Sequence, residues 1–203
     1  EISDRAIIHP SAIIEPNVMI APNVKIGKYT YIQSNVIIHE HTFIGDHCVV
    51  NSGSVIGTDA FYFKRNGESF KKWRSGGQVI IEDRVDIGAA CTISKGVSGD
   101  TIIGEGSKLD CQVHIGHGVI VGKNCLFAAQ VGIGGKTVIE DNVTLSGQVG
   151  VAQSIRIGAK AIVLAKSGVS KTLEGGKTYF GAPAIEARQY YREMAAVRML
   201  AKK

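Results

Sequence analysis

Two histidines in the segment LDCQVHIGHGV have the residue type and spacing for acid–base chemistry. His114 and His117 stand three residues apart among glycines and branched apolar residues. An imidazole has an unperturbed pKa of about 6.5, so its neutral form can take a proton from a reacting amine near neutral pH. From the pattern alone His117 is either a general base or a plain surface histidine, and the elements that carry it decide how it can act.

A strict six-residue period runs through the sequence around these histidines. Such a period fits neither an amphipathic helix nor a simple alternating strand. It is typical of a parallel β-helix, in which each hexapeptide forms one short strand and a turn and three of them close a coil. We therefore predict an all-β solenoid. The apolar positions of the longest uninterrupted run are Ile103, Leu109, Ile115, Val121, Phe127, Ile133, Ile139, Leu145, Val151, Ile157, Val163 and Val169.

The same period is present from Ile2 to Ile56 and defines the domain organisation. An aromatic and basic segment, 58–78, breaks the period and predicts a loop of about 20 residues, a length that is commonly functional. The repeat resumes at Ile81 and slips by four residues through 95–100. We expect the β-helix to occupy residues 1–174, with the 58–78 insertion, and a turn and helix to occupy 175–203. That helix is expected to cover the open end of the solenoid, whose strand edges need protection.

Residues 18 apart in a three-sided coil stack directly over one another, at about the 4.8 Å spacing of neighbouring strands. Gly135 is then one coil from His117 and leaves space over its imidazole, and Gln153 is two coils away. Gln112, Gln130 and Gln148 share the same spacing. They predict a ladder of side-chain amides.

Composition narrows the class of protein further. A formal charge of +5 fits an acidic partner protein or a phosphorylated ligand and is too weak to indicate nucleic acid.

Cys48, Cys91 and Cys125 fall at or beside inward positions and predict small core residues of a reduced, cytoplasmic protein. No apolar run reaches the roughly 20 residues that span a bilayer, so no membrane insertion is expected. His41 and His47 lack further ligands, and no metal site is predicted.

Several stretches resemble the UDP-3-O-acylglucosamine N-acyltransferases of lipid A biosynthesis. These stretches are IGTDAFYFKRNGESFKKW, VIIEDRVDIGAACTI, DTIIGEGSKLDCQVHIGHGVIVG and YFGAP with the helix that follows it. The resemblance covers nearly the whole chain. The hexapeptides alone are shared by many sugar acyl- and acetyltransferases, whereas the aromatic loop, the four-residue slip and LD-x-x-x-x-I-x-H together are fairly specific.

The resemblance implies a left-handed parallel β-helix that forms a homotrimer. It implies transfer of a 3-hydroxyacyl group from the phosphopantetheine thioester of acyl carrier protein to the 2-amino group of a UDP-glucosamine derivative, with no permanently bound cofactor. His117 falls on the family's catalytic base, Gly135 on the glycine whose N–H holds the oxyanion, and Asp110 on an aspartate seven residues before the base. Phe61 and Phe63 fall where the aromatic loop borders the donor.

The chain also departs from the family pattern. From the resemblance we expect a chain without the family's N-terminal uridine-binding domain. Cys111 replaces an asparagine of the family, and Ser154 stands where a second active-site histidine is found. His114, Gln153 and Ser154 complete the expected substrate-binding residues. Two alternatives stay open: a coenzyme-A-dependent acetyltransferase acting on a sugar or small amine, and a non-catalytic hexapeptide scaffold in which His117 is incidental. The basic helix, with Arg188, Arg192, Arg198, Lys202 and Lys203, suits an acidic carrier protein or is a solvated face.

Overall fold

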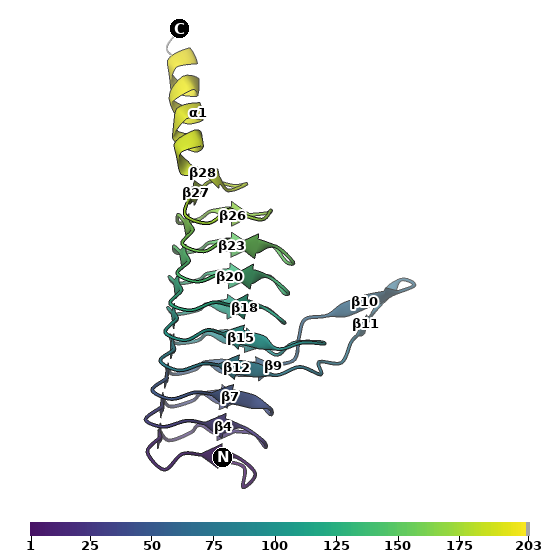
Figure 1. The fold of residues 1–203 in the computed structure, drawn as a ribbon. Helices are drawn as coiled ribbons and strands as arrows, with labels where there is room; N and C mark the ends of the chain where they lie inside the picture. The colour runs from purple at the N-terminus through teal and green to yellow at the C-terminus, as the bar shows by residue number, and fades with distance from the viewer. Residues whose placement is uncertain (202–203) are drawn as a thin grey trace.

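The structure, a computed structural model that describes residues 1–201, is a three-sided parallel β-solenoid with one helix at its C-terminal end (Figure 1). Each coil contributes one short strand to each of three sheets, so every sheet runs the length of the stack. The predicted all-β solenoid is confirmed. We name the sheets the histidine face, the isoleucine face and the third face.

The histidine face contains eight strands. Their bounds are β3 (Met19–Ile20), β6 (Ile37–Ile38), β9 (Val55–Thr58), β14 (Thr92–Ser94), β17 (His114–Ile115), β20 (Gly132–Ile133), β23 (Gly150–Val151) and β26 (Gly168–Val169).

The isoleucine face also contains eight strands. Their bounds are β1 (Ile7–Ile8), β4 (Lys25–Ile26), β7 (Thr42–Ile44), β12 (Val79–Ile81), β15 (Thr101–Ile103), β18 (Ile120–Val121), β21 (Val138–Ile139) and β24 (Arg156–Ile157).

The third face contains ten strands. Their bounds are β2 (Ile13–Ile14), β5 (Tyr31–Ile32), β8 (Val49–Val50), β13 (Asp86–Ile87), β16 (Lys108–Leu109), β19 (Leu126–Phe127), β22 (Thr144–Leu145), β25 (Ile162–Val163), β27 (Thr178–Phe180) and β28 (Ile185–Glu186).

The six-residue period places the core. In most two-residue strands the first side chain points outward and the second is buried, and the second positions are the apolar ones of the period. Ile115 pairs with Ile133 in the next coil, which is the register that an 18-residue coil requires. Phe127 is the largest side chain that is fully buried. Burial of this column removes apolar surface from water, at roughly 25 cal/mol for each Å².

The corners explain why glycine and asparagine recur between strands. One turn residue in most hexapeptides has a left-handed backbone conformation, as at Asn124 (φ 53°) and Asn142 (φ 60°), which asparagine tolerates better than most residues. A Cβ on Gly116 would approach the backbone nitrogen of Gly135 to 2.7 Å. Glycine at this position therefore allows neighbouring coils to stack closely.

The amide ladder expected at one corner is present. Gln130 donates from Nε2 to Gln112 Oε1 at 2.8 Å, and Gln148 donates to Gln130 Oε1 at 2.7 Å. All three residues have a positive φ and lie one coil apart. The ladder confirms the 18-residue coil.

The expected 58–78 insertion leaves the solenoid as an antiparallel hairpin that projects to one side (Figure 1). Its strands are β10 (Phe63–Asn66) and β11 (Ser69–Lys72), joined through Gly67 and Glu68. Gly67, with φ 63°, supplies the positive φ that a tight hairpin turn needs. At its base, Lys95 lies 3.5 Å from Asp59, and Ala60 donates its N–H to Ser75 Oγ.

The C-terminal end differs in detail from the expectation. The stack extends past residue 174, because β27 adds to β25 in parallel, and β28 then pairs with β27 in antiparallel. Helix α1 (Ala187–Leu200) continues away from the last coil (Figure 1), and Ala187 is its only buried residue. The strand edge is therefore covered by β28 and the first turn of α1 rather than by the whole helix. Lys202 and Lys203 lie outside the described residues.

Two expectations from composition concern the burial of the cysteines and the absence of a membrane-spanning segment. Cys48, Cys91 and Cys125 are buried free thiols, as predicted, and Cys111 is exposed. Burial raises the pKa of Cys48 and of Cys91 to about 11. Among residues 1–201, none of the helical structure has the length and apolar character needed to cross a bilayer.

Candidate active site

His117 lies at the corner that follows β17, and its imidazole is held between the coil and the hairpin. Only 9 % of the residue is exposed. Its carbonyl accepts the N–H of Lys136 at 2.8 Å, which fixes the backbone of this corner. Neither ring nitrogen has a hydrogen-bond partner within residues 1–201, and Nδ1 is fully buried. A buried polar atom without a partner is costly, and such atoms in a native fold call for an explanation.

Gly135 lies one coil from His117, as predicted, and makes room for the ring. A Cβ at this position would come within 2.6 Å of His117 Nε2 and 2.8 Å of Cε1. The Gly135 N–H has no acceptor within the described chain, whereas its carbonyl accepts the N–H of Ser154. A free backbone donor therefore lies beside the imidazole.

The hairpin closes one side of the site. An open hollow of about 620 Å³ is lined by His117, Gln153 and four aromatic residues of the hairpin segment, Phe61, Tyr62, Phe63 and Phe70. We call it the aromatic hollow. The structure thus brings together His117, Gln153, Phe61 and Phe63, all of which the sequence predicted at the site. Phe61 and Phe63 pack edge to face with ring centroids 5.0 Å apart.

Tyr62 and Lys136 contact the site although the sequence analysis did not single them out. The ring of Tyr62 stands edge-on to the imidazole, with centroids 5.5 Å apart. Lys136 Nζ lies 5.4 Å from the centroid of Tyr62, within cation–π range. Burial, and secondarily the charge of Lys136, lower the pKa of His117 below its usual value. The imidazole is therefore neutral at pH 7 and able to accept a proton.

Three other predicted residues do not line the aromatic hollow. Asp110 follows β16 of the third face, and its Oδ1 accepts the N–H of Cys111 at 2.7 Å. His114 points outward on β17, where its Nδ1 lies 2.7 Å from Thr92 Oγ1, and burial lowers its pKa. Ser154 is a turn residue with φ 58°. A role for any of the three needs a ligand or a second chain.

The sequence held a signal for the missed residues. Tyr62 lies between the two predicted phenylalanines, Phe61 and Phe63, and all three residues line the aromatic hollow. Lys136 is 19 residues after His117, so stacking places it at the next corner beside Gly135. Phe70 faces Arg65 across the hairpin register, a pairing that follows once Gly67-Glu68 is taken as the turn.

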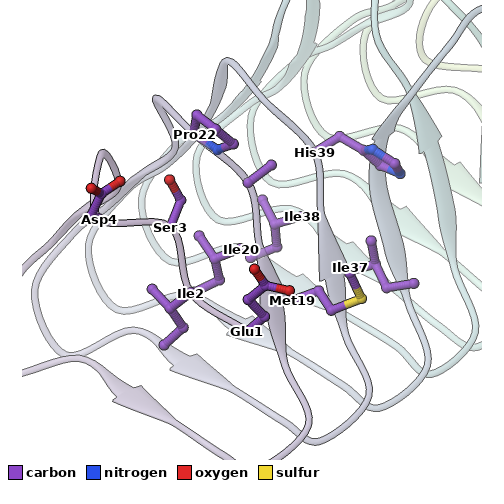
Figure 2. Close-up of a pocket in the computed structure, with 11 residues that line it drawn as sticks. Glu1, Ile2, Ser3, Asp4, Met19, Ile20, Pro22, Ile37, Ile38 and His39 are labelled. Carbon is purple, nitrogen blue, oxygen red and sulfur yellow. The ribbon is translucent and has the colours of Figure 1, made fainter.

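A further hollow lies at the first coils of the chain, around Met19, Ile37 and His39. Its ionisable groups are spread out: Glu1, Asp4 and His39 lie at separate places around it (Figure 2). No pair of them is placed for proton transfer. Within residues 1–201, no group of three or more histidine, cysteine or carboxylate side chains is placed to hold a metal ion. The candidate chemistry therefore centres on His117.

Two family models match the hexapeptide-repeat part of the chain. A family model described as bacterial transferase hexapeptide (six repeats) matches residues 100–135, which contain His117 and Gly135. A second model, described as GMPPB C-terminal domain, matches residues 1–62. The first match falls on coils of the solenoid, and the second covers its first coils and the start of the 58–78 insertion.

Curated relatives narrow this class. A UDP-3-O-acylglucosamine N-acyltransferase from Methylobacterium sp. (strain 4-46) is 36% identical over 151 residues, covering 74% of this chain and 43% of the relative. The enzyme of the same name from Campylobacter jejuni subsp. doylei is 42% identical over 151 residues, covering 73% of this chain and 47% of the relative. The chain thus spans less than half the length of these relatives.

Solved structures match over more of their length. UDP-N-acetylglucosamine O-acyltransferase from Moraxella catarrhalis superposes with a TM-score of 0.83 at 32% identity, covering 95% of this chain and 75% of that one. The Francisella novicida UDP-N-acetylglucosamine acyltransferase gives a TM-score of 0.75 at 27% identity, covering 96% and 73%. The chain therefore belongs to the hexapeptide-repeat acyltransferases, the family of these enzymes.

Proposed function

We propose that this chain transfers a 3-hydroxyacyl group from the phosphopantetheine thioester of an acyl carrier protein to the amine of a UDP-linked amino sugar, as in lipid A biosynthesis. The observation that carries the proposal is His117: a neutral, nearly buried imidazole between the aromatic hollow and the free N–H of Gly135. The names of the relatives, which are N-acyltransferases of a UDP-acylglucosamine, support the choice of acceptor class.

The proposed reaction needs a general base and a hydrogen-bond donor for the oxyanion, the roles given to His117 and to the N–H of Gly135. The amine nitrogen attacks the thioester carbonyl carbon, a C–N bond forms, and the carbonyl electron pair moves onto oxygen. His117 takes the proton that the nitrogen loses, and the Gly135 N–H is the proposed donor to the oxyanion. When the tetrahedral intermediate collapses, the C–S bond breaks, and the thiolate takes the proton back from His117.

The aromatic hollow favours a long acyl group over acetyl. Four aromatic side chains line about 620 Å³, a volume far above what an acetyl group fills and within the range of pockets for larger ligands. This supports the carrier-protein donor over the coenzyme-A-dependent acetyltransferase. The hydroxyacyl chain would lie against Phe61 and Phe63.

The proposed partner surface for the carrier protein is helix α1. Arg188, Arg192 and Arg198 are exposed, and within residues 1–201 none of them pairs with a carboxylate. Cations on an exposed face steer an acidic partner and raise its association rate. The cytoplasmic location stays a prediction that accompanies this partner.

A homotrimer is proposed for the working assembly. The outward positions of the isoleucine face form a continuous apolar column over five coils, made of Phe43, Ile80, Ile102, Ile120 and Val138. Contiguous apolar surface of this kind marks an association site. Ile80→Glu would place a charge in the column. Sedimentation equilibrium should give a trimer for the parent chain and a smaller species for the variant, and a monomeric parent would contradict the assembly.

The function itself is tested with two donors and one acceptor class. The full chain is incubated with a UDP-amino sugar and either hydroxyacylated carrier protein or acetyl-coenzyme A, and products are measured by mass spectrometry. We expect N-acylated sugar from the carrier-protein donor. Product from acetyl-coenzyme A alone would establish the acetyltransferase alternative. Binding of sugar that His117→Ala leaves unchanged, without product from either donor, would establish the scaffold.

A further inference from the structure

His117 forms part of two separate hollows. The aromatic hollow is one, and the other, of about 460 Å³, is lined by the segment 97–100 together with Gly118 and Lys136 and by Ile102 and Ile120 of the isoleucine face. Ile102 and Ile120 also belong to the apolar column proposed as the subunit contact, so in the proposed trimer this hollow lies at the edge of that contact. We call the second the lysine hollow. The two linings share only His117. A reacting amine at the imidazole could therefore belong to a molecule in one hollow while the acyl group occupies the other.

Lys136 brings an unneutralised positive charge to this point. Five other lysines, namely Lys72, Lys95, Lys108, Lys123 and Lys177, have a carboxylate oxygen within 4 Å. No carboxylate lies that close to Lys136 among residues 1–201. Its backbone is fixed by the bond from its N–H to the His117 carbonyl, so the base of the side chain keeps its place beside the imidazole.

The rest of the lysine hollow offers further donors. The N–H groups of Val97, Ser98 and Gly99 have no acceptor within the described chain. Gly76 and Gly77 donate to the carbonyls of Val97 and Gly96, which holds the segment in place. One carboxylate opposes an anion here, that of Asp100, whose Oδ1 accepts the N–H of Gln78 at 2.9 Å. Successive free N–H groups with a cation nearby are a common anion-binding arrangement.

The charge of Lys136 also has a consequence for the base. It disfavours the imidazolium, the form that His117 takes when it accepts the proton of the amine. A bound anion beside Lys136 would cancel this penalty, because opposite charges within a few ångströms stabilise the protonated base. Of the two charged groups that line the lysine hollow, Lys136 lowers the pKa of His117, whereas Asp100 only shares the lining. The centroid of the Tyr62 ring lies 5.4 Å from Lys136 Nζ.

We propose that the lysine hollow binds a phosphate group of a substrate through Lys136 and the N–H groups of 97–99. This inference rests on the proposed function, which supplies two phosphate-bearing substrates. In a nucleotide-linked 2-amino sugar the phosphate is on the carbon next to the one that carries the amine, so an amine at His117 places a phosphate within a few ångströms. The phosphodiester of phosphopantetheine is separated from its thioester by the whole pantetheine arm. The geometry therefore favours the diphosphate of the acceptor.

The test is a titration of His117 by nuclear magnetic resonance in the full chain, which needs no turnover. Spectra are recorded alone, with inorganic pyrophosphate, with a UDP-amino sugar and with 4′-phosphopantetheine. The variant is Lys136→Met, which removes the positive charge of the side chain and keeps a similar side-chain length. Its matched control is Lys160→Met, a turn lysine with the same backbone conformation (φ 60° against 61°).

We expect pyrophosphate and the UDP-amino sugar to raise the pKa of His117 in the parent chain and in Lys160→Met. In Lys136→Met the pKa should be higher without ligand and unmoved by pyrophosphate. The affinity for the UDP-amino sugar should fall about tenfold or more, the usual effect of losing a hydrogen bond to a charged group. A response to 4′-phosphopantetheine alone that depends on Lys136 would assign the phosphate to the donor and overturn the acceptor assignment.

The two proposals fail separately. Unchanged affinity and an unchanged His117 titration in Lys136→Met would overturn the inference, even if the parent chain transfers acyl groups. Lys136-dependent binding of pyrophosphate and the UDP-amino sugar would support it, even if no acyl transfer is found. If transfer is found, Lys136→Met should raise the KM for the acceptor about tenfold and leave the KM for the acyl donor unchanged.

Discussion

His117 and Gly135 face each other across one coil spacing, so close that a single methyl group on Gly135 would come within 2.6 Å of His117 Nε2. Glycine is needed here for space rather than for an unusual backbone, because Gly135 is not among the glycines with positive φ. The imidazole has no hydrogen bond within residues 1–201 to hold it against such a displacement. The position of the base therefore depends on the absence of a side chain one coil away.

Gly135→Ala should displace the imidazole and greatly reduce acyl transfer while the solenoid stays folded. Overpacking of this kind costs about 1–3 kcal/mol of stability, and a misplaced catalytic group costs roughly a hundredfold in rate. Steady-state kinetics and circular dichroism measure the two effects. Gly132→Ala is the matched control in the same coil, because nothing lies within 4 Å of a Cβ there. Equal activity of the two variants would contradict the role given to this contact.

The pH dependence of kcat/KM should have its acidic limb below the usual histidine range. Burial and the charge of Lys136 lower the pKa of His117, and the neutral ring is the active form of a general base. Activity is therefore present above the lowered pKa and is lost as the pH falls through it. Lys136→Met removes one of the two causes and should move the limb to higher pH. A shift to lower pH in that variant would refute the assignment.

Tyr62→Ala should weaken activity more than Tyr62→Phe. The ring of Tyr62 packs edge-on against the imidazole and lies under Lys136, and phenylalanine keeps this ring. Its loss opens the aromatic hollow to water beside His117 and should raise the pKa of the base. Kinetic pH profiles of the two variants provide the comparison. Similar profiles for alanine and phenylalanine would mean that the contact has no part in positioning the base.

Phe127→Ala should destabilise the solenoid by about 3–5 kcal/mol, the usual cost of truncating a buried aromatic residue. Phe127 is 1% exposed, whereas the adjacent Leu126 is 49% exposed on the third face. Leu126→Ala should change stability by roughly 0.5 kcal/mol or less, as surface substitutions usually do. Thermal unfolding of the two variants measures the difference. Comparable losses at both positions would contradict the inward and outward assignment of the repeat.

The sequence predicted the features that repeat and predicted less well the features that occur once. The hexapeptide period placed Ile115, Phe127 and the ladder at Gln130, because the 18-residue coil turns sequence spacing directly into spatial neighbours. The same arithmetic placed Gly135 against His117. It could not place Tyr62, since the hairpin has its own alternation and approaches the solenoid from outside.

The C-terminal end shows the same limit. The six-residue period does not predict that β27 continues the third face with Tyr179 pointing inward. Ile162 of β25 pairs with Thr178 of β27, and these residues are 16 apart rather than the 18 of a regular coil. The helix was predicted from good helix formers and the helical spacing of apolar residues in 185–203, and neither indicates in which direction α1 leaves the last coil. Asp110 was carried over from a resemblance, and in this chain its carboxylate is bound to the N–H of Cys111.

The most direct test of the account is single-turnover acyl transfer by the full chain with His117 replaced. The parent chain, His117→Ala and the exposed control His39→Ala are mixed with hydroxyacylated carrier protein and a UDP-amino sugar, and the N-acylated product is followed by mass spectrometry. General base catalysis contributes about 10²–10⁴-fold, so His117→Ala should be slower by at least a hundredfold and His39→Ala should match the parent. A His117→Ala rate within a few fold of the parent would show that the chemistry lies elsewhere.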